Sequence, residues 1–173
     1  MEKTVVIYKS VYGTTKQYAQ WIAEELGTQL LEVSSVKPAR LMDYDVVIYG
    51  GGLYAGGIIG AKLVAKNPCK SLIVFTVGLA TPETTDYKDI LAMNFSPEQL
   101  EKIRVFHLHG GIDYRKLGLA HKAMMAFKKK QVEKTPAEKR TSDDRQFLET
   151  YGAKADFLDR DAIAPLVDYV RSI

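Results

Sequence analysis

The chain has 173 residues, of which 46% are hydrophobic and 26% are charged, and its formal net charge is +3. These values are typical of one globular domain with a sizeable core, and no apolar run approaches the roughly 18 residues that a bilayer span requires. With a single cysteine, Cys69, an intrachain disulfide is excluded and a cysteine-based structural zinc site lacks its ligands. The short apolar run near the N-terminus predicts a strand and not a signal peptide, so we expect a cytoplasmic protein.

Apolar runs rich in β-branched residues alternate with helical patterns along the chain. Strands are predicted over residues 3–9, 29–33, 45–49, 71–77 and 104–109. Helices are predicted over 14–26, about 59–66, from Ser96 onwards, and about 161–172. Continuous apolar strands separated by helices indicate an α/β fold whose parallel sheet is covered on both faces.

Ligands of such sheets bind outside the carboxyl ends of the strands, which directs attention to residues 10–15, 50–57 and 77–86. The first of these loops offers hydroxyls at Ser10, Thr14 and Thr15 and a flexible turn at Gly13. With the free N–H groups of the following helix, it predicts a phosphate site. Because residues 10–15 contain no Lys or Arg, a terminal monophosphate fits better than a polyphosphate. A helix N-cap without a ligand is the alternative.

The other two loops are rich in small residues. The run from Gly50 to Gly57 lets the backbone approach a ligand closely and supplies one aromatic ring, Tyr54. The run from Val77 to Pro82 forms a second small-residue wall at the same edge of the sheet. A phosphate site flanked by two such walls suits a phosphorylated planar ring.

The first loop, Ser10-Val11-Tyr12-Gly13-Thr14-Thr15, resembles the phosphate loop of the flavodoxin-like FMN proteins. In the pattern of that family Tyr12 takes the place of a common Thr. A closer resemblance is to the branch that includes quinone-dependent protoporphyrinogen oxidases. Three further stretches carry it: Leu53-Tyr54-Ala55-Gly56, Gly110-Gly111-Ile112-Asp113-Tyr114 and Asp159-Arg160-Asp161-Ala162-Ile163.

The resemblance implies a flavodoxin-like three-layer sandwich with a five-stranded parallel sheet of order 2-1-3-4-5, spanning residues 1–173 as a single domain. It also implies noncovalent FMN, whose chemistry the protein tunes. The implied cofactor-binding residues are Ser10, Val11, Tyr12, Gly13, Thr14, Thr15, Gly52, Leu53, Tyr54, Ala55, Val77, Gly78, Leu79 and Ala80. Beside these loops we expect neither a catalytic side chain nor a metal. Asp113 and Tyr114 are expected to shape the entrance or to pack the segment that follows.

A basic segment over residues 115–145 carries a net charge of +6, which leaves −3 for the rest of the chain. It predicts a helical insertion before the last helix. Two interpretations stay open: an amphipathic helix packed on its own domain, or docking to an acidic redox protein or, through residues 115–140, to an anionic membrane surface. Nucleic acid is not expected as a partner, because the segment lacks interleaved aromatic residues.

Rival folds and functions lack their signatures. A receiver domain needs Asp where strand three ends at Gly50, a tyrosine phosphatase needs Arg where Phe75 follows Cys69, and a nucleotide hydrolase needs a Gly-Lys-Ser/Thr tripeptide. The glycines after strand three match a dinucleotide-binding motif, but that motif follows the first strand of its fold and not the third. His107 and His109 are interpreted as packing or hydrogen-bonding residues. Two classes remain, an FMN electron carrier serving a redox partner protein or quinone, and an FMN-dependent oxidoreductase of the protoporphyrinogen oxidase type.

Overall fold

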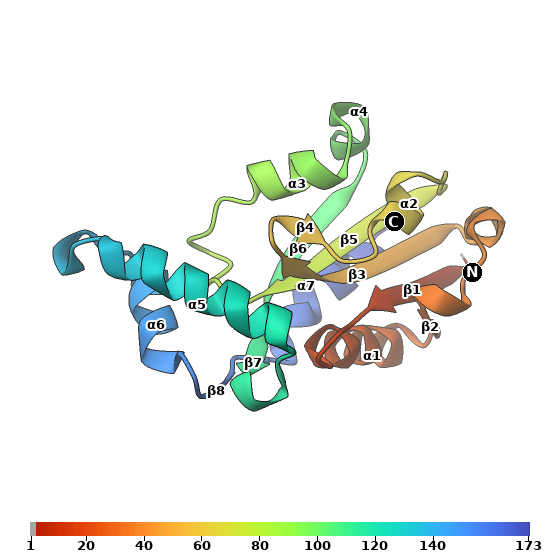
Figure 1. Ribbon diagram of the computed structural model, residues 1–173. Coiled ribbons are helices and arrows are strands. Elements are labelled where there is room, and N and C mark those ends of the chain that lie inside the picture. The colour runs from red at the N-terminus through yellow and green to blue at the C-terminus, as the bar shows by residue number, and fades with distance from the viewer. Residues whose placement is uncertain (1–2) are drawn as a thin grey trace.

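The computed structural model describes residues 3–173 and contains a central parallel sheet (Figure 1). Its strands are β1 (Thr4–Lys9), β2 (Gln29–Glu32), β3 (Val46–Tyr54), β5 (Ser71–Gly78) and β6 (Arg104–His109). They follow the order β2-β1-β3-β5-β6, and all four neighbouring pairs are parallel. The predicted α/β fold and the order 2-1-3-4-5 of the five parallel strands are confirmed.

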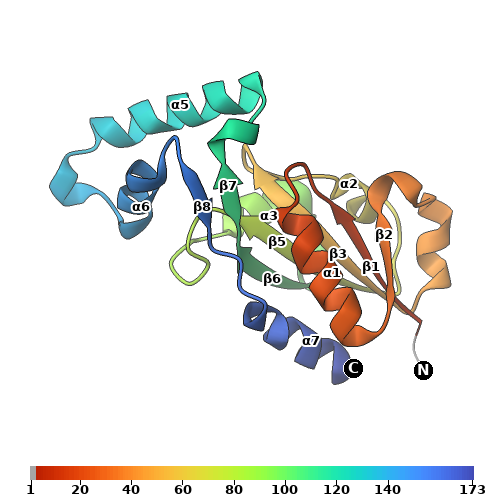
Figure 2. The ribbon, with the colours of Figure 1, turned by 90° about the horizontal axis from the view of Figure 1, so that it is seen from below.

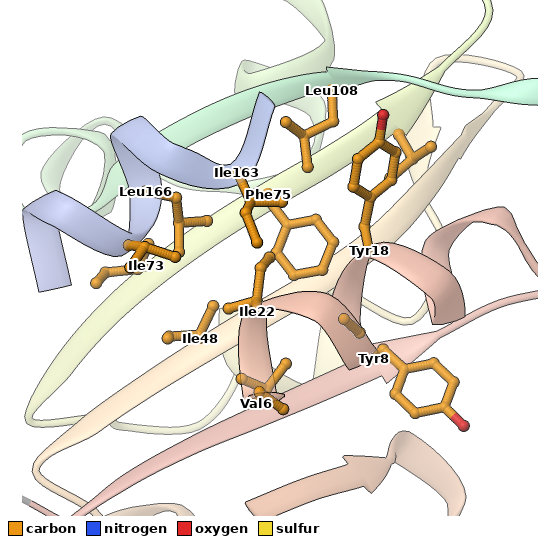
Figure 3. Packing of buried hydrophobic residues seen from close by; sticks show 14 of the residues in the cluster. Val6, Tyr8, Tyr18, Ile22, Ile48, Ile73, Phe75, Leu108, Ile163 and Leu166 are labelled. Carbon is orange, nitrogen blue, oxygen red and sulfur yellow. The ribbon is translucent and has the colours of Figure 1, made fainter. Parts of the chain in front are cut away.

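The apolar strands are continuous because both faces of the sheet are buried. Alternate residues point to opposite faces, so Val6 and Ile48 join one core cluster while Val5 and Val47 join the other. Figure 3 shows the first cluster, in which the ring of Phe75 lies among side chains from both helices of that layer. Two separate cores, one on each face, therefore hold the sheet between two helical layers.

One face of the sheet is covered by α1 (Thr14–Leu26) and α7 (Ala164–Arg171), the latter preceded by a 3-10 turn, η5 (Asp161–Ile163). The other face is covered by η2 (Pro38–Asp43), α2 (Lys62–Ala65), α3 (Lys88–Asn94) and α4 (Pro97–Leu100). A short 3-10 turn, η1 (Val33–Ser35), follows β2. The layers agree with the three-layer arrangement that the resemblance implies.

The phenol of Tyr18 ties three parts of this scaffold together. Its hydroxyl donates to the carbonyl oxygen of His109 at 2.7 Å and accepts from the N–H of Asp159 at 3.0 Å. Burial raises the pKa of Tyr18 by more than the hydrogen bond from Asp159 N–H lowers it, so the phenol stays protonated and can donate. The end of β6 and the approach to α7 are thus fixed to the same residue of α1.

Some predicted boundaries were wrong. β3 does not stop at Tyr49 but continues through Gly50, Gly51 and Gly52, which pair with β1 or β5 in the ladder. The helix predicted from Ile59 begins only at Lys62, because Gly57–Ile58 forms a short strand, β4, against β3. The capped turn at Ser96 is confirmed: its hydroxyl accepts from Gln99 N–H, and the Gln99 side chain accepts from Ser96 N–H.

The chain leaves the sheet after β6 and returns to it before α7 (Figure 2). This segment, residues 111–156, is called the excursion below. It begins and ends in an antiparallel pair, β7 (Gly111–Asp113) and β8 (Lys154–Asp156). Between them lie η3 (Tyr114–Lys116), α5 (Leu119–Lys134), η4 (Ala137–Lys139) and α6 (Ser142–Thr150). A third cluster holds them together, formed by Tyr114, Leu117, Met125, Val132 and Phe147.

The helices described over residues 3–173 include none that is both long and apolar enough to cross a membrane.

Candidate functional site

The first loop joins β1 to α1 through a turn that needs glycine. Gly13 has φ of 98° in the left-handed region, and its N–H donates to Ser10 Oγ at 3.0 Å. No side chain within residues 3–173 caps α1, so the first-turn amides keep their outward donors. Thr15 is buried at the start of the helix, and Thr14 is half-buried beside it. This geometry presents hydroxyl and N–H donors together with the positive end of the helix dipole.

The second loop is a tight hairpin between β3 and β4. Ala55 and Gly56 have φ of 48° and 78°, so both central residues of the turn lie in the left-handed region. Ile58 N–H, just after the turn, donates to Asn94 Oδ1 of α3 at 3.0 Å. A Cβ at Gly52 would lie 3.0 Å from the Tyr54 ring and 3.4 Å from Thr15 Oγ1. The glycine therefore lets this wall approach the first loop closely.

The third loop follows β5 and is held from β6. Gly78 carbonyl oxygen accepts from Gly110 N–H at 2.7 Å, and His109 Nε2 lies 3.0 Å from the carbonyl oxygen of Leu79. From the excursion, Asp143 accepts the N–H of Thr81 at 3.2 Å. The backbone of the third loop is thus held at Gly78, Leu79 and Thr81 by one backbone bond and two side-chain contacts.

The three loops surround one cavity of about 510 Å³. Of the residues predicted to bind a cofactor, all but Gly13 line it; Gly13 instead provides the turn that starts α1. The lining residues among the predictions are Ser10, Val11, Tyr12, Thr14, Thr15, Gly52, Leu53, Tyr54, Ala55, Val77, Gly78, Leu79 and Ala80. Segments separated by more than 60 residues in the sequence therefore meet at a single site.

The cavity also has walls that the sequence did not reveal. Thr85 of the third loop, Tyr87 just before α3 and Ile90 of α3 also line it. Asp113 lines the cavity as expected, whereas Tyr114 is buried in the third cluster and packs the excursion. Beside Asp113, the residues Gly110, Gly111 and Ile112 also line it. The remaining wall comes from α5 and the turn before it: Leu117, His121, Met124, Met125, Phe127, Lys128 and Gln131. These residues reach the cavity only because the excursion folds back over the loops. The sequence pattern of α5 itself does not indicate this.

The polar groups of the cavity are mostly neutral. Burial raises the pKa of Tyr54 to about 12, so its phenol is protonated at neutral pH. The Arg115 guanidinium donates hydrogen bonds to the Asp113 carboxylate and lowers the pKa of Asp113 to about 2. The lining thus carries one ionised carboxylate, already paired with a cation, and the ammonium group of Lys128, while most of its other polar groups are hydroxyls and amides.

His107 and His109 are packing and hydrogen-bonding residues, as predicted. His107 Nδ1 lies 2.6 Å from Thr76 Oγ1, and its ring stacks on Tyr87 with centroids 3.5 Å apart. Burial lowers the pKa of His107 to about 4. The His109 ring stacks on Phe157, with centroids 4.3 Å apart.

The basic segment does not present a continuous apolar helix face to its own core. Met125 and Val132 of α5 are buried, but Leu119 and Phe127 are exposed. Two of its lysines are engaged within the excursion, Lys128 Nζ at 4.8 Å from the centroid of the Phe147 ring and Lys129 Nζ at 4.7 Å from that of Tyr151. Part of the predicted basic surface therefore packs against α6 and the residue that follows it.

Residues 5–139 match the family model described as a flavodoxin domain, from β1 to the end of η4. The chain belongs to this flavodoxin domain family. It is therefore a flavodoxin-like flavoprotein, and the family implies a flavin cofactor. The matched residues include all three loops of the cavity and the whole of α5, so α5 lies within the family's domain.

Individual relatives are distant. A stretch of 55 residues is 33% identical to the uncharacterized protein MJ0298 of Methanocaldococcus jannaschii, and it covers 31% of this chain and 37% of that protein. The oxidised Flavodoxin 2 from Bacillus cereus is 18% identical, with a TM-score of 0.48, over 62% of this chain and 84% of that one. A WrbA-like flavodoxin protein from Agrobacterium tumefaciens is 24% identical, with a TM-score of 0.41, over 58% of this chain and 71% of that one.

Proposed function

We propose that the cavity binds FMN noncovalently and that this flavodoxin-domain protein transfers electrons through it. One observation carries the proposal: the uncapped N-terminus of α1 and the two small-residue loops open into the same cavity of about 510 Å³. Such a helix start binds a phosphate without cationic side chains. The two walls leave room for a planar ring beside it.

Each wall has a distinct role in this proposal. Ser10, Thr14 and Thr15 hold the phosphate through hydroxyls and first-turn amides, and Gly13 sets the turn. The ring lies between the second and third loops. The residues that line it there are Gly52, Leu53, Tyr54, Ala55, Val77, Gly78, Leu79 and Ala80.

FMN supplies the electron-transfer chemistry when it is bound, and the residues of the chain bind it, orient it and exclude water from it. The backbone bond from Gly110 to Gly78 and the contact of His109 with Leu79 keep the third wall fixed. Because Tyr54 keeps its proton at neutral pH, it adds no negative charge beside the ring. The cavity thus favours a neutral ring at one end and a dianionic ester at the other.

The electron-transfer partner is a redox protein or a quinone. The basic segment supports an acidic protein surface as the docking partner, since Lys116, Lys122, Lys130 and Lys134 remain exposed there. Peripheral contact with an anionic membrane through residues 115–140 is the competing interpretation. Co-sedimentation with anionic vesicles at low salt decides between them, because binding there would favour the membrane.

Binding of FMN to the purified apo chain tests the proposal directly. We expect the emission of added FMN to be quenched as it enters the cavity, and titration gives its Kd. Removing one phosphate-binding hydroxyl with Thr14→Val should weaken binding about tenfold, as for a hydrogen bond to a charged group. Thr135→Val, outside the cavity, is the matched control. Absence of quenching in the unsubstituted chain would refute the proposal.

The protoporphyrinogen oxidase alternative stays a prediction from the resemblance. Its test is anaerobic oxidation of protoporphyrinogen by the FMN-loaded protein with a quinone as acceptor. Turnover would assign the chain to that enzyme class, and its absence in a protein that binds FMN would leave the electron carrier.

A further inference from the structure

The start of α5 is attached to the phosphate loop by a single hydroxyl. Tyr12 Oη accepts from the N–H of Gly118, the residue before α5, at 3.2 Å. The same oxygen lies 2.5 Å from Nδ1 of His121 in the first turn of α5, to which it can donate its own proton. One side chain of the loop therefore holds both the backbone and a side chain of the helix start.

Three rings from three different segments meet at this attachment. The His121 ring stacks on Tyr54 with centroids 4.9 Å apart and an angle of 29°, and it meets Tyr12 edge-on at 5.4 Å. Tyr12 and Tyr54 are 6.5 Å apart. All three residues line the cavity. The first loop, the second loop and α5 are thus joined in the wall of the cavity.

Apolar packing supports the same arrangement. Leu117 and Met125 are buried in the third cluster, and Tyr12 of the first loop and Leu79 of the third loop pack against that cluster. The excursion therefore rests on two of the three loops that form the cavity. Its inner side supplies cavity walls at Met124 and Gln131.

We propose that α5 is the closing wall of the flavin pocket and that Tyr12 and His121 form the latch that holds it shut. The proposal rests on the proposed binding of FMN. In the flavodoxin pattern that this loop resembles, Thr is common where this chain has Tyr12. The larger residue gives up a hydroxyl near the phosphate and gains an anchor for the helix that follows β6. Tyr12 and His121 are positioning residues, and flavin exchange requires their contact to open.

The test measures flavin release together with exposure of the latch. Tyr12→Phe keeps the ring and removes the hydroxyl, and His121→Phe keeps the stacking on Tyr54 and removes Nδ1. Stopped-flow recovery of FMN emission gives the dissociation rate. We expect His121→Phe to raise it roughly fivefold, as for one neutral hydrogen bond of about 1 kcal/mol, and Tyr12→Phe, which also loses the bond to Gly118 N–H, to raise it further. The double variant should be little faster than Tyr12→Phe alone, because that variant already removes the contact with His121. Tyr169→Phe, on α7, is the matched control.

A second readout needs no flavin. In the apo chain, amide hydrogen exchange at Gly118 and through the first turn of α5 should accelerate in both variants and not in Tyr169→Phe. If the unsubstituted chain binds FMN but the variants release it at the same rate, the latch is refuted and the proposed function stands. If the unsubstituted chain does not bind FMN, the proposed function fails, and unchanged exchange at Gly118 would refute the latch independently. Should Tyr12→Phe fold poorly, Tyr12→Leu, which also lacks a hydroxyl, replaces it with the same expectations.

Discussion

Gly50 occupies a position in β3 where no side chain fits. A Cβ there would lie 2.0 Å from Cζ of Phe75, whose ring fills the core between the sheet and α1. We expect Gly50→Ala to lower the free energy of unfolding by about 3 kcal/mol, the upper range for overpacking a core. Urea denaturation followed by circular dichroism measures this change. Gly57→Ala, where the new Cβ would make only ordinary contact at 3.5 Å, should change stability little; equal losses in both variants would contradict the steric explanation.

His107 gives the fold a dependence on acid. Its pKa is lowered to about 4 by burial, below the ordinary value of 6.5, so the folded chain holds fewer protons than the unfolded chain between these values. Above pH 6.5 His107 is neutral in both states and does not reduce the stability of the fold. As the pH falls towards 4, the unfolded chain is protonated first, and the free energy of unfolding decreases. We expect a loss of about 2 kcal/mol, below the full linkage value because the ring is partly exposed to water.

Urea denaturation at several pH values between 4 and 7 tests this expectation. His107→Gln, which does not titrate, should flatten the slope over that interval while Thr76 keeps a hydrogen-bonding neighbour. An unchanged slope in the variant would show that another group is responsible.

Among single residues, the sequence pattern found lining residues of the cavity where they lie close together in the chain. The hydroxyls and the glycine of the first loop are adjacent in the chain, so their pattern alone indicates a phosphate site. His121 could not be found in this way. Its contacts are with Tyr12 and Tyr54, more than 60 residues away, and a histidine in a basic helix has no distinguishing local pattern.

The helix α6 begins with a capping box. Thr141 Oγ1 accepts from Asp144 N–H at 3.1 Å, and Asp144 Oδ2 accepts from Thr141 N–H at 3.0 Å. We expect Thr141→Ala to destabilise α6 by about 1 kcal/mol. Amide hydrogen exchange should show the loss over residues 142–150 and leave β1 and β3 unchanged, with the neighbouring Ser142→Ala as control. Exchange that accelerates equally in the central strands would mean that α6 does not open separately.

Among the elements, the strands were predictable and some of their ends were not. A buried parallel strand is a continuous apolar run, and the sequence displays it directly. The glycines at 50–52 resemble a loop because glycine has a low strand propensity, yet β1 and β5 supply ladder partners on both sides and keep them in β3. The two short strands of the excursion, β7 and β8, pair across 40 residues, which no local pattern reveals.

The molecule as a whole consists of a sheet with two cores and an excursion with a third. The third cluster shares no buried residue with the other two. We therefore expect a chain in which Asn-Gly replaces residues 114–153 to fold, because Asp113 and Lys154 are already paired and a two-residue turn can join them. Denaturant unfolding should give a single cooperative transition, as in the full chain. A shortened chain without helical and strand circular dichroism would contradict this separation.

Charge is also divided at the scale of the molecule. The segment 115–145 carries +6 and the remainder −3, so an acidic redox protein should approach the side of the cavity that carries α5. We expect electron transfer from the reduced protein to an acidic acceptor to slow by about tenfold between low and physiological salt. Stopped-flow rates at several ionic strengths measure this, with a neutral small-molecule acceptor as control. A rate independent of salt would argue against steering by this segment.

The phenol of Tyr18 has a consequence for how such proteins diversify. It binds the chain at His109, where the polypeptide departs from the sheet, and again at Asp159, where it comes back. A segment inserted between these two residues therefore starts and ends at positions that α1 fixes, whatever the length or sequence of the segment. The sheet and its two helical layers therefore provide a fixed attachment site for such a segment. Grafting a different helical module between residues 113 and 154 should change which molecules reach the cavity without disturbing the framework that forms it.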